Sequence, residues 1–299
     1  MQQWLYPSGE PLVSPNRRSI RPAPHRRLVS GMQRWPLAIL AAVALIGSGW
    51  ALRSANSTPE RAEVQTGVRV VGSLRVEVLR EFPHDTTAYT QGLLWSQGKL
   101  YESTGQPGTS TLRRLDPVMG NVEQRIDIDP TLFGEGLTRV GDRLIMLTWK
   151  AQQALVFDID RFDQVGTFRY RGEGWGLCHD GRRLVMSNGS DTLTFRDPQS
   201  FKDVGEIAVT LRGQPQTRLN ELECVGDAIY ANVWERDYIV RINPRSGRVT
   251  HQIDAAGLLS PAEARQADVL NGIAYSPATD TFFITGKWWP KMFEVRFVE

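Results

Sequence analysis

Cysteine and histidine are scarce in this sequence, and their scarcity argues against several kinds of protein. The 299 residues contain two cysteines and four histidines. Two cysteines are too few for a disulfide scaffold, and no CxxC pair or Cys/His cluster suggests a metal site. There is also no HExxH, GxSxG or phosphate-binding glycine loop. The sequence therefore gives no support to a zinc peptidase, a serine hydrolase or a nucleotide-binding fold, and we expect neither metal nor cofactor.

A large excess of charge of one sign is also missing. The formal net charge is +2, so composition does not favour a nucleic-acid partner. A content of 41% hydrophobic and 23% charged residues is typical of a soluble globular protein. Basic residues nevertheless crowd the start of the chain, mixed with Pro and Ser: Arg17, Arg18, Arg21, Arg26, Arg27 and Arg34. We interpret residues 1–34 as a basic, disordered arm.

An uncharged apolar segment, WPLAILAAVALIGSGWAL, follows at residues 35–52. Its length is at the lower limit for a membrane-spanning helix, which would be an anchor with the arginines left inside. Alternatively it is the core of an export signal cleaved near Ala51, and a start at Met32 would suit such a signal. A buried core helix is less favoured. Both favoured interpretations place the remainder in the periplasm or outside the cell, with residues 35–52 as the one membrane contact and 53–67 as a linker.

The rest of the chain contains one sequence unit five times. Each copy has a small or polar start, a short apolar run, a turn with Gly or Asp, and a second alternating run. The copies are QGLLWSQGKLYESTG, EGLTRVGDRLIMLTW, WGLCHDGRRLVMSNG, NELECVGDAIYANVW and NGIAYSPATDTFFITGK. Their apolar anchors recur every 40 to 51 residues: Leu93, Leu137, Leu177, Leu222 and Ile273. Two more strand-like runs follow each of the first four copies.

Four short strands in a repeat of this length are typical of a propeller blade. We predict an all-β, five-bladed β-propeller over residues 68–299, preceded by the N-terminal apolar helix and the linker. The fifth copy is one strand short. Residues 68–82 would supply that strand, pairing the first and last segments and covering two sheet edges. A β-sandwich is less favoured because its strands would not recur so regularly. Residues 258–269 form the one helix-like insert.

Five residues occupy an equivalent position, two before each anchor, where the innermost strand of each blade begins. They are Gln91, Glu135, Trp175, Asn220 and Asn271. Buried polar groups cost free energy unless they are paired, so such a ring indicates either a functional site or a hydrogen-bonded ring that holds water. Glu135 stands between two glycines in FGEGLT and is the only carboxylate that this pattern places inward.

A second set of equivalent positions lies about twelve residues after the anchors, where the second strand returns to the same end of the blade. These positions hold Gly105, Trp149, Gly189, Trp234 and Lys287. Tyr89 and Phe133 each precede a ring residue by two. Three tryptophans, two further aromatic residues, one acid and several amides at one opening predict a small aromatic-walled site for a small molecule or a chain end.

The residue types in this site restrict its chemistry. Burial would raise the pKa of Glu135 toward the range that suits proton transfer. No Ser or Cys is paired with a base, which argues against a covalent intermediate. The absence of a second acid in the ring argues against ordinary glycoside hydrolysis. The pattern fits acid–base assistance of a reaction whose two partners already lie in one substrate.

Longer motifs carry a resemblance to a known family. FPHDTTAYTQGL, YESTG, FGEGLT, GWGL, LNELE, ANVW, VLNGIAY and TGKWWPKMFEV closely resemble, in this order over residues 80–297, the plant and bacterial type of glutaminyl-peptide cyclotransferase. The resemblance implies a five-bladed propeller that converts N-terminal glutamine of peptides to pyroglutamate and releases ammonia. It implies no metal, and we expect a monomer whose partners are peptides or proteins with N-terminal glutamine.

The resemblance also implies roles for residues at matching positions. Glu135 becomes the acid/base, and three polar residues would orient the amide or stabilise the oxyanion: Gln91, Asn220 and Lys287. The aromatic wall would be Tyr89, Phe133, Trp149, Trp175 and Trp234, with Asn271 as a second-tier candidate. Tyr89 stands where the family commonly has Phe, so this chain adds a hydroxyl to the wall.

The repeat also makes a prediction about the two cysteines. Cys178 and Cys224 are offset by one position in the repeat, which predicts that they point to opposite faces and do not form a disulfide. The competing functions are a catalytically silent propeller that binds a peptide or protein at the same opening, and a sugar lyase or lactonase-like propeller. The latter would need metal-ligating side chains at several inward positions, where the pattern shows one carboxylate.

Overall fold

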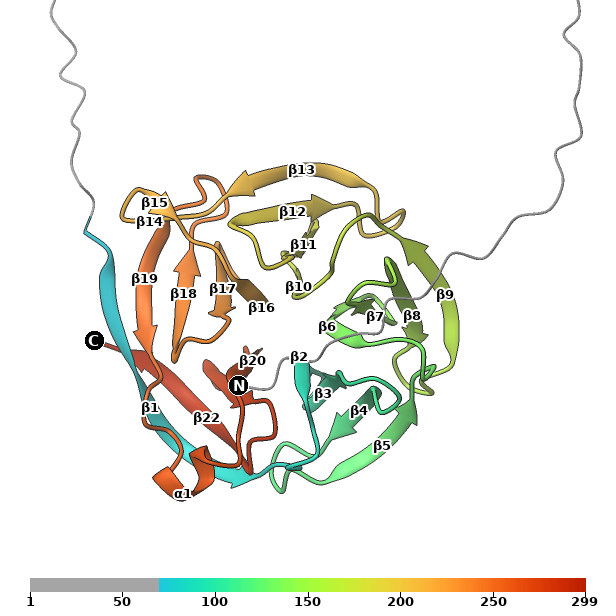
Figure 1. Cartoon of the computed structure of the whole chain (residues 1–299), viewed down its shortest axis with the longest axis horizontal. Coiled ribbons are helices and arrows are strands. Elements are labelled where there is room, and N and C mark those ends of the chain that lie inside the picture. Colours follow the sequence, from blue (N-terminus) through green and yellow to red (C-terminus); the bar gives the residue numbers. More distant parts are fainter. Residues whose placement is uncertain (1–69) are drawn as a thin grey trace, which may run out of the picture. The chain divides into compact units, whose positions relative to one another are not determined.

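The computed structural model describes residues 70–299, which form an all-β domain of sheets arranged as blades around a common centre (Figure 1). One helix occurs in this described range, α1 (Pro261–Ala264), inside the insert where the sequence predicts it. The predicted arm, apolar segment and linker (1–34, 35–52 and 53–67) lie outside the described residues. From residue 70 onward, no helix is long and apolar enough to cross a membrane.

Each repeat unit forms an antiparallel meander that runs from the centre of the domain to its rim. The innermost strands are β2 (Thr90–Ser96), β6 (Gly134–Val140), β10 (Leu177–His179), β16 (Leu219–Val225) and β20 (Leu270–Ser276). The second strands are β3 (Lys99–Thr104), β7 (Arg143–Thr148), β11 (Leu184–Met186), β17 (Ala228–Val233) and β21 (Thr281–Gly286). The third strands are β4 (Thr111–Leu115), β8 (Gln153–Asp158), β12 (Thr192–Arg196), β18 (Tyr238–Ile242) and β22 (Lys291–Val298).

The outermost strands complete the sheets. They are β5 (Val122–Asp127), β9 (Gln164–Arg169), β13 (Asp203–Ala208), β19 (Val249–Asp254) and β1 (Gly72–Pro83). A short hairpin of β14 (Thr210–Leu211) and β15 (Gln214–Pro215) follows β13. Strands β2 to β5, β6 to β9 and β10 to β13 form separate four-stranded sheets, whereas β16 to β22 and β1 are joined in one sheet of eight.

Strand β1 joins the two ends of the domain. It pairs antiparallel with β22, from Arg75 opposite Val298 to Pro83 opposite Lys291. This confirms the predicted pairing of the first and last segments. The other edge of β1 pairs in parallel with β19, which is what merges two groups of strands into the eight-stranded sheet. The β22 side of β1 is paired over Arg75–Pro83, whereas its β19 side is paired only over Gly72–Arg75.

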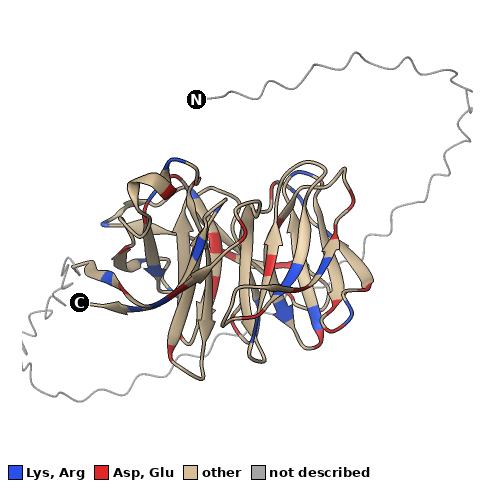
Figure 2. Ribbon diagram, turned by 90° about the horizontal axis from the view of Figure 1, so that it is seen from below, with Lys and Arg blue, Asp and Glu red and all other residues tan. Residues whose placement is uncertain are grey.

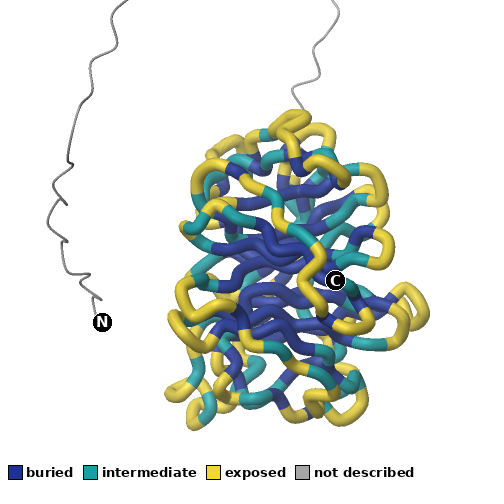
Figure 3. Tube along the Cα trace, turned by 90° about the vertical axis from the view of Figure 1, so that its right-hand side faces the viewer, coloured by how far each residue is buried: buried dark blue, intermediate teal, exposed yellow. Residues whose placement is uncertain are grey.

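Buried residues gather in the middle of the domain (Figure 3), and the core clusters join residues of neighbouring sheets. Inner strands are buried on both faces, as on β6, whereas the outer strand β5 alternates between half-buried and exposed positions. The five anchors of the repeat are at most 1% exposed, and burial of each such side chain contributes about 1.5–3 kcal/mol. The apolar period in the sequence therefore identifies the residues that pack one sheet against the next.

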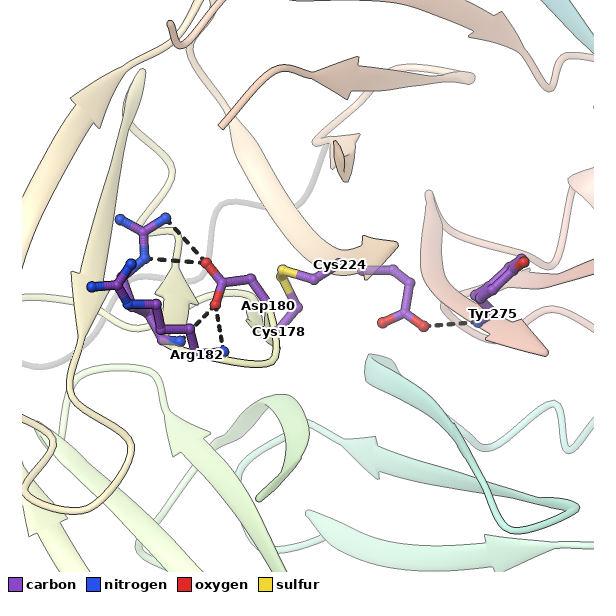
Figure 4. The surroundings of a disulfide bond; sticks show 7 residues. Cys178, Asp180, Arg182, Cys224 and Tyr275 are labelled. Atoms are coloured by element: carbon purple, nitrogen blue, oxygen red, sulfur yellow. Dashed lines mark hydrogen bonds and ion pairs between the residues drawn. A yellow bond between two sulfur atoms is a disulfide. The ribbon is translucent and has the colours of Figure 1, made fainter. Parts of the chain in front are cut away.

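A disulfide links Cys178 on β10 to Cys224 on β16, with 5.5 Å between their Cα atoms (Figure 4). The prediction that these cysteines do not pair is wrong. Their offset does send them to opposite faces of their own sheets, but these sheets are neighbours. Opposite faces of adjacent blades look toward each other, so the offset is what lets the two sulfur atoms meet. The bond ties two innermost strands together beside the buried Leu222.

Replacing both cysteines by alanine is expected to lower the stability of the domain. The disulfide closes a loop with a sequence separation of 46 residues, for which loop-closure entropy gives about 4 kcal/mol. In a domain of this size that corresponds to a fall in Tm of roughly 10 °C. Thermal unfolding followed by circular dichroism checks it, with the reduced wild type as control. A double variant that melts together with the oxidised wild type would contradict a stabilising role.

Candidate active site

The innermost strands share a backbone irregularity at the ring positions. The pairing register shifts between residues 90 and 92 in β2, 134 and 137 in β6, 219 and 222 in β16, and 270 and 273 in β20. Bulges of this kind turn side chains away from the regular alternation and are common beside functional sites. The repeat thus presents its ring residue in the same unusual way in each of these four strands.

The two glycines around Glu135 are required by the close approach of neighbouring backbones. A Cβ on Gly134 would lie 2.7 Å from the carbonyl oxygen of Thr104. A Cβ on Gly136 would lie 2.6 Å from the carbonyl oxygen of Trp175, to which the Gly136 N–H donates a hydrogen bond of 2.7 Å. The motif FGEGLT therefore combines two positions that admit no side chain with one that directs a carboxylate inward.

Glu135 is 4% exposed and is connected to two other ring residues. Gln91 Nε2 donates to Glu135 Oε1 at 3.1 Å. The Gln91 Oε1 in turn accepts a long hydrogen bond of 3.5 Å from Asn271 Nδ2, which also donates to the Thr90 carbonyl at 3.0 Å. Asn271 thus lies behind Gln91 and fixes which way the Gln91 amide faces, so that its NH₂ group points at the carboxylate.

The electrostatics of the site depend on Glu135 and Lys287, which is 4% exposed. Burial raises the pKa of Glu135 well above its ordinary value, and Lys287 opposes this while Glu173 adds to it. Burial lowers the pKa of Lys287, and the charges of Glu135 and Asp268 act against that fall. Desolvation therefore brings the proton affinities of an acid and a base toward each other, which is the direction that suits proton transfer to and from a substrate.

Aromatic rings surround these polar groups. Tyr89 meets Phe133 edge-to-face with their ring centroids 6.2 Å apart, and Phe133 lies 5.5 Å from Trp149. Trp175 and Trp234 form another edge-to-face pair at 5.8 Å. All five residues are half-buried, so each keeps part of its surface accessible to solvent. The predicted wall is thus assembled as two contiguous aromatic groups.

Lys287 and Asn220 complete the set of predicted residues. Lys287 Nζ lies 4.6 Å from the centroid of the Tyr89 ring, and the Tyr89 hydroxyl interacts with Asp268. Asn220, 2% exposed on β16, has its carbonyl against Gly176 of β10. We call the ten residues the Glu135 cluster: Tyr89, Gln91, Phe133, Glu135, Trp149, Trp175, Asn220, Trp234, Asn271 and Lys287.

Comparisons with known proteins show the family of this chain. The model of the glutamine cyclotransferase family matches residues 48–297. The chain belongs to this family. It is 40% identical over 227 residues to the glutaminyl-peptide cyclotransferase of Arabidopsis thaliana, a match that covers 74% of this chain and 71% of the plant protein. It is also similar to the crystal structure of Myxococcus xanthus glutaminyl cyclase, with 40% identity, a TM-score of 0.70, and coverage of 77% of this chain and 99% of the bacterial one.

The prediction that Glu135 is the only inward carboxylate of this glutamine cyclotransferase is wrong. Glu221 is fully buried on β16 and accepts the backbone N–H groups of Leu93 at 3.3 Å and Ile273 at 2.9 Å. Those residues belong to β2 and β20, so the carboxylate lies among the innermost strands, and acidic residues on strands inside the domain are visible in Figure 2. Burial raises the pKa of Glu221 well above its ordinary value.

A signal for Glu221 was present in the sequence. Four ring residues are followed by glycine, namely at Gly92, Gly136, Gly176 and Gly272, whereas Asn220 is followed by Glu221. Four positions without side chains leave room for one long one. Glu223, two residues on, accepts the Tyr275 N–H at 2.8 Å (Figure 4), and burial raises its pKa to about 8.

Glu173 is a further acid that the sequence analysis missed. It lies between β9 and β10, two residues before Trp175, and its Oε2 accepts hydrogen bonds from Trp149 Nε1 at 2.7 Å and from Trp175 Nε1 at 3.0 Å. The GEGWG motif contained this acid, but it occurs in one repeat and so gives no recurring pattern. Among residues 70–299, no three His, Cys, Asp or Glu side chains form a group that could hold a metal ion.

The Glu135 cluster is distinct from the hollows on the outside of the domain. A cavity of about 440 Å³ lies among β5, β8 and β9, and its lining combines apolar residues with Asp127, Asp129, Asp163, Gln153 and Gln164. None of its lining residues belongs to the cluster, and no base or nucleophile faces these aspartates there. The predicted site residues therefore lie on and beside the innermost strands, away from this cavity.

Proposed function

We propose that this protein is a glutaminyl-peptide cyclotransferase that converts N-terminal glutamine of peptides or proteins to pyroglutamate and releases ammonia. Its membership of the family supports this activity, as does the name of the Arabidopsis thaliana relative. The single observation that carries the proposal is the position of Glu135. It is a buried carboxylate with a raised pKa, hydrogen-bonded to Gln91, close to Lys287 and surrounded by aromatic rings.

Glu135 acts as the base and then as the acid. It takes a proton from the α-amino group of the substrate, whose nitrogen then attacks the γ-carbonyl carbon and forms the ring C–N bond. The carbon–nitrogen bond of the side-chain amide breaks as Glu135 returns a proton to the leaving nitrogen, and ammonia departs. The raised pKa suits both directions of transfer. No metal enters these steps.

The polar neighbours stabilise and orient the reacting amide. We assign the positive charge of Lys287 and the amides of Gln91 and Asn220 to the γ-carbonyl oxygen as it gains charge, because such stabilisation is often the largest contribution in acyl transfer. Asn271 supports Gln91 through the hydrogen bond described above. Because the reacting groups belong to one residue, the remaining task is to hold glutamine in the folded, ring-forming conformer.

The aromatic wall holds that conformer and limits access of water. The aliphatic part of the glutamine side chain is enclosed by five rings, those of Tyr89, Phe133, Trp149, Trp175 and Trp234. The rest of the peptide extends out of the site on the solvent side of the cluster. Water excluded from the carbonyl cannot compete as a nucleophile and hydrolyse the amide to glutamate.

An ammonia-release assay tests the proposed activity. The purified domain is incubated with a dipeptide that begins with glutamine, and ammonia is measured with a coupled enzyme beside a mass-spectrometric assay for the loss of NH₃. We expect release well above the spontaneous rate. Binding of the dipeptide without release would instead support the alternative, a silent propeller that captures peptides at the same opening.

The finer organisation of the chain is part of the same proposal. We propose five blades of four strands, with the eight-stranded sheet divided at the parallel junction of β19 and β1. We propose that residues 68–299 are the catalytic domain and that it acts as a monomer. Its position in the periplasm or outside the cell follows from residues 35–52, as a cleaved signal or an inner-membrane anchor after the basic arm of residues 1–34, with residues 53–67 as the linker.

A further inference from the structure

One carboxylate oxygen joins the two tryptophans that approach each other from neighbouring blades. Trp149 follows β7 and Trp175 precedes β10, and both indole N–H groups donate to Glu173 Oε2, at 2.7 Å and 3.0 Å. A charged acceptor makes stronger hydrogen bonds than a neutral one. An indole has one N–H, so each ring makes its only conventional hydrogen bond to this oxygen.

The remaining aromatic contacts of the two rings leave part of each ring exposed: the ring centroid of Trp149 lies 5.5 Å from that of Phe133, and Trp175 lies 5.8 Å from Trp234. Both are half-buried, and neither is packed on all sides. Trp175 packs over Gly189, where a Cβ would lie 2.7 Å from the ring, so glycine provides the space but no contact that fixes the tilt. The outer face of Trp149 carries the exposed Lys150, whose Nζ lies 3.8 Å from the ring centroid and 3.9 Å from Glu173 Oε1.

We propose that Glu173 is a positioning residue that fixes the planes of Trp149 and Trp175, and with them the width of the aromatic enclosure for the substrate glutamine. This inference rests on the proposed function, because it assigns those rings to substrate binding. The inference goes beyond the proposed function because it assigns the orientation of two rings of the aromatic wall to one side chain that does not touch the reacting atoms.

The charge of Glu173 has a second effect on the reaction. Glu173 raises the pKa of Glu135 as a like charge, in addition to the effect of burial. Lys287 acts on Glu135 in the opposite direction, and the hydroxyls of Tyr89 and Tyr170 also lie within the field of Glu135. Asp268 acts on Lys287, and Lys150 pairs with Glu173. Glu173 therefore sets ring geometry through hydrogen bonds and the protonation of Glu135 through its charge.

Two substitutions separate these effects. Glu173→Gln retains an oxygen that can accept both indole N–H groups but removes the charge. Glu173→Ala removes both. We expect Glu173→Ala to raise KM for a glutamine-initiated dipeptide about tenfold or more, since two charge-assisted hydrogen bonds are lost. Glu173→Gln should retain a KM close to that of wild type while the acidic limb of its pH–kcat/KM profile moves to lower pH.

Glu206→Ala, which removes an exposed carboxylate on the outer strand β13, is the matched control. Thermal unfolding of each variant shows whether the fold is retained. The inference is overturned if Glu173→Ala has the KM of wild type, or if a folded Glu173→Gln protein fails to keep a KM close to that of wild type. A wild type that releases no ammonia overturns the proposed function instead, so the two failures are distinguishable.

Discussion

Replacing Glu135 by glutamine is expected to lower kcat for cyclisation by about 10²–10⁴-fold, the usual contribution of a positioned acid or base. The amide is nearly isosteric and keeps an oxygen that can accept the hydrogen bond from Gln91 Nε2. It cannot take a proton from the α-amino group or return one to the leaving nitrogen. Binding surfaces stay in place, so KM should change little, and the loss should fall on kcat in the ammonia-release assay.

The matched control is the same substitution at Glu221. That side chain is also fully buried with a raised pKa, but it is bonded to the backbone of β2 and β20 rather than to the Glu135 cluster. Glu221→Gln should retain most of the activity if folded. A Glu135→Gln enzyme with more than about a tenth of the wild-type kcat would exclude Glu135 as the group that moves the proton.

Lys287→Met carries the second large expectation, a fall of about 10²–10³-fold in kcat/KM at neutral pH. Methionine keeps an unbranched side chain of similar length but has no charge to offer the developing oxyanion. The positive charge of Lys287 also holds down the pKa of Glu135. Without it Glu135 stays protonated to higher pH, so the acidic limb of the pH–kcat/KM profile should move to higher pH, opposite in direction to Glu173→Gln.

Rates measured between acidic and alkaline pH, at substrate concentrations well below KM, check both parts of this expectation. Lys291→Met is the control, because Lys291 forms ion pairs with Glu81 and Glu263 away from the cluster. An unchanged position of the acidic limb in Lys287→Met would show that Lys287 does not act on Glu135. If Lys287→Met reaches the full wild-type rate at high pH, Lys287 acts only through the protonation of Glu135.

The repeat explains why the fold and most of the cluster were accessible from sequence. A unit that recurs places equivalent residues at equivalent positions, so Gln91, Glu135 and Asn220 could be aligned without knowing any distance. The same logic placed Lys287, whose N–H donates to the Val269 carbonyl at 3.0 Å just as the N–H of Trp149 donates to Phe133. Periodicity predicts what the blades share.

What the blades do not share was missed. Glu173 and Glu221 each occur in one repeat, and their importance depends on contacts between repeats: Glu173 joins Trp149 to Trp175, and Glu221 reaches β2 and β20. The disulfide was missed for the same reason, because register within one sheet says little about which faces of two sheets meet. Contacts between units require the angle from one blade to the next, which no local pattern contains.

The pairing of β1 with β22 also determines when, during synthesis of the chain, the domain can be completed. The strand that closes the domain is made first among the described residues, and its partner is made last. Lys287 lies four residues before β22, and a backbone hydrogen bond from His84 to Pro290 holds the connecting segment beside β1. A nascent chain thus has no complete Glu135 cluster until nearly its whole length has emerged. Contacts between segments so distant in sequence also slow folding. A chain that ended before β22 would lack the partner of β1, and we expect it to be inactive.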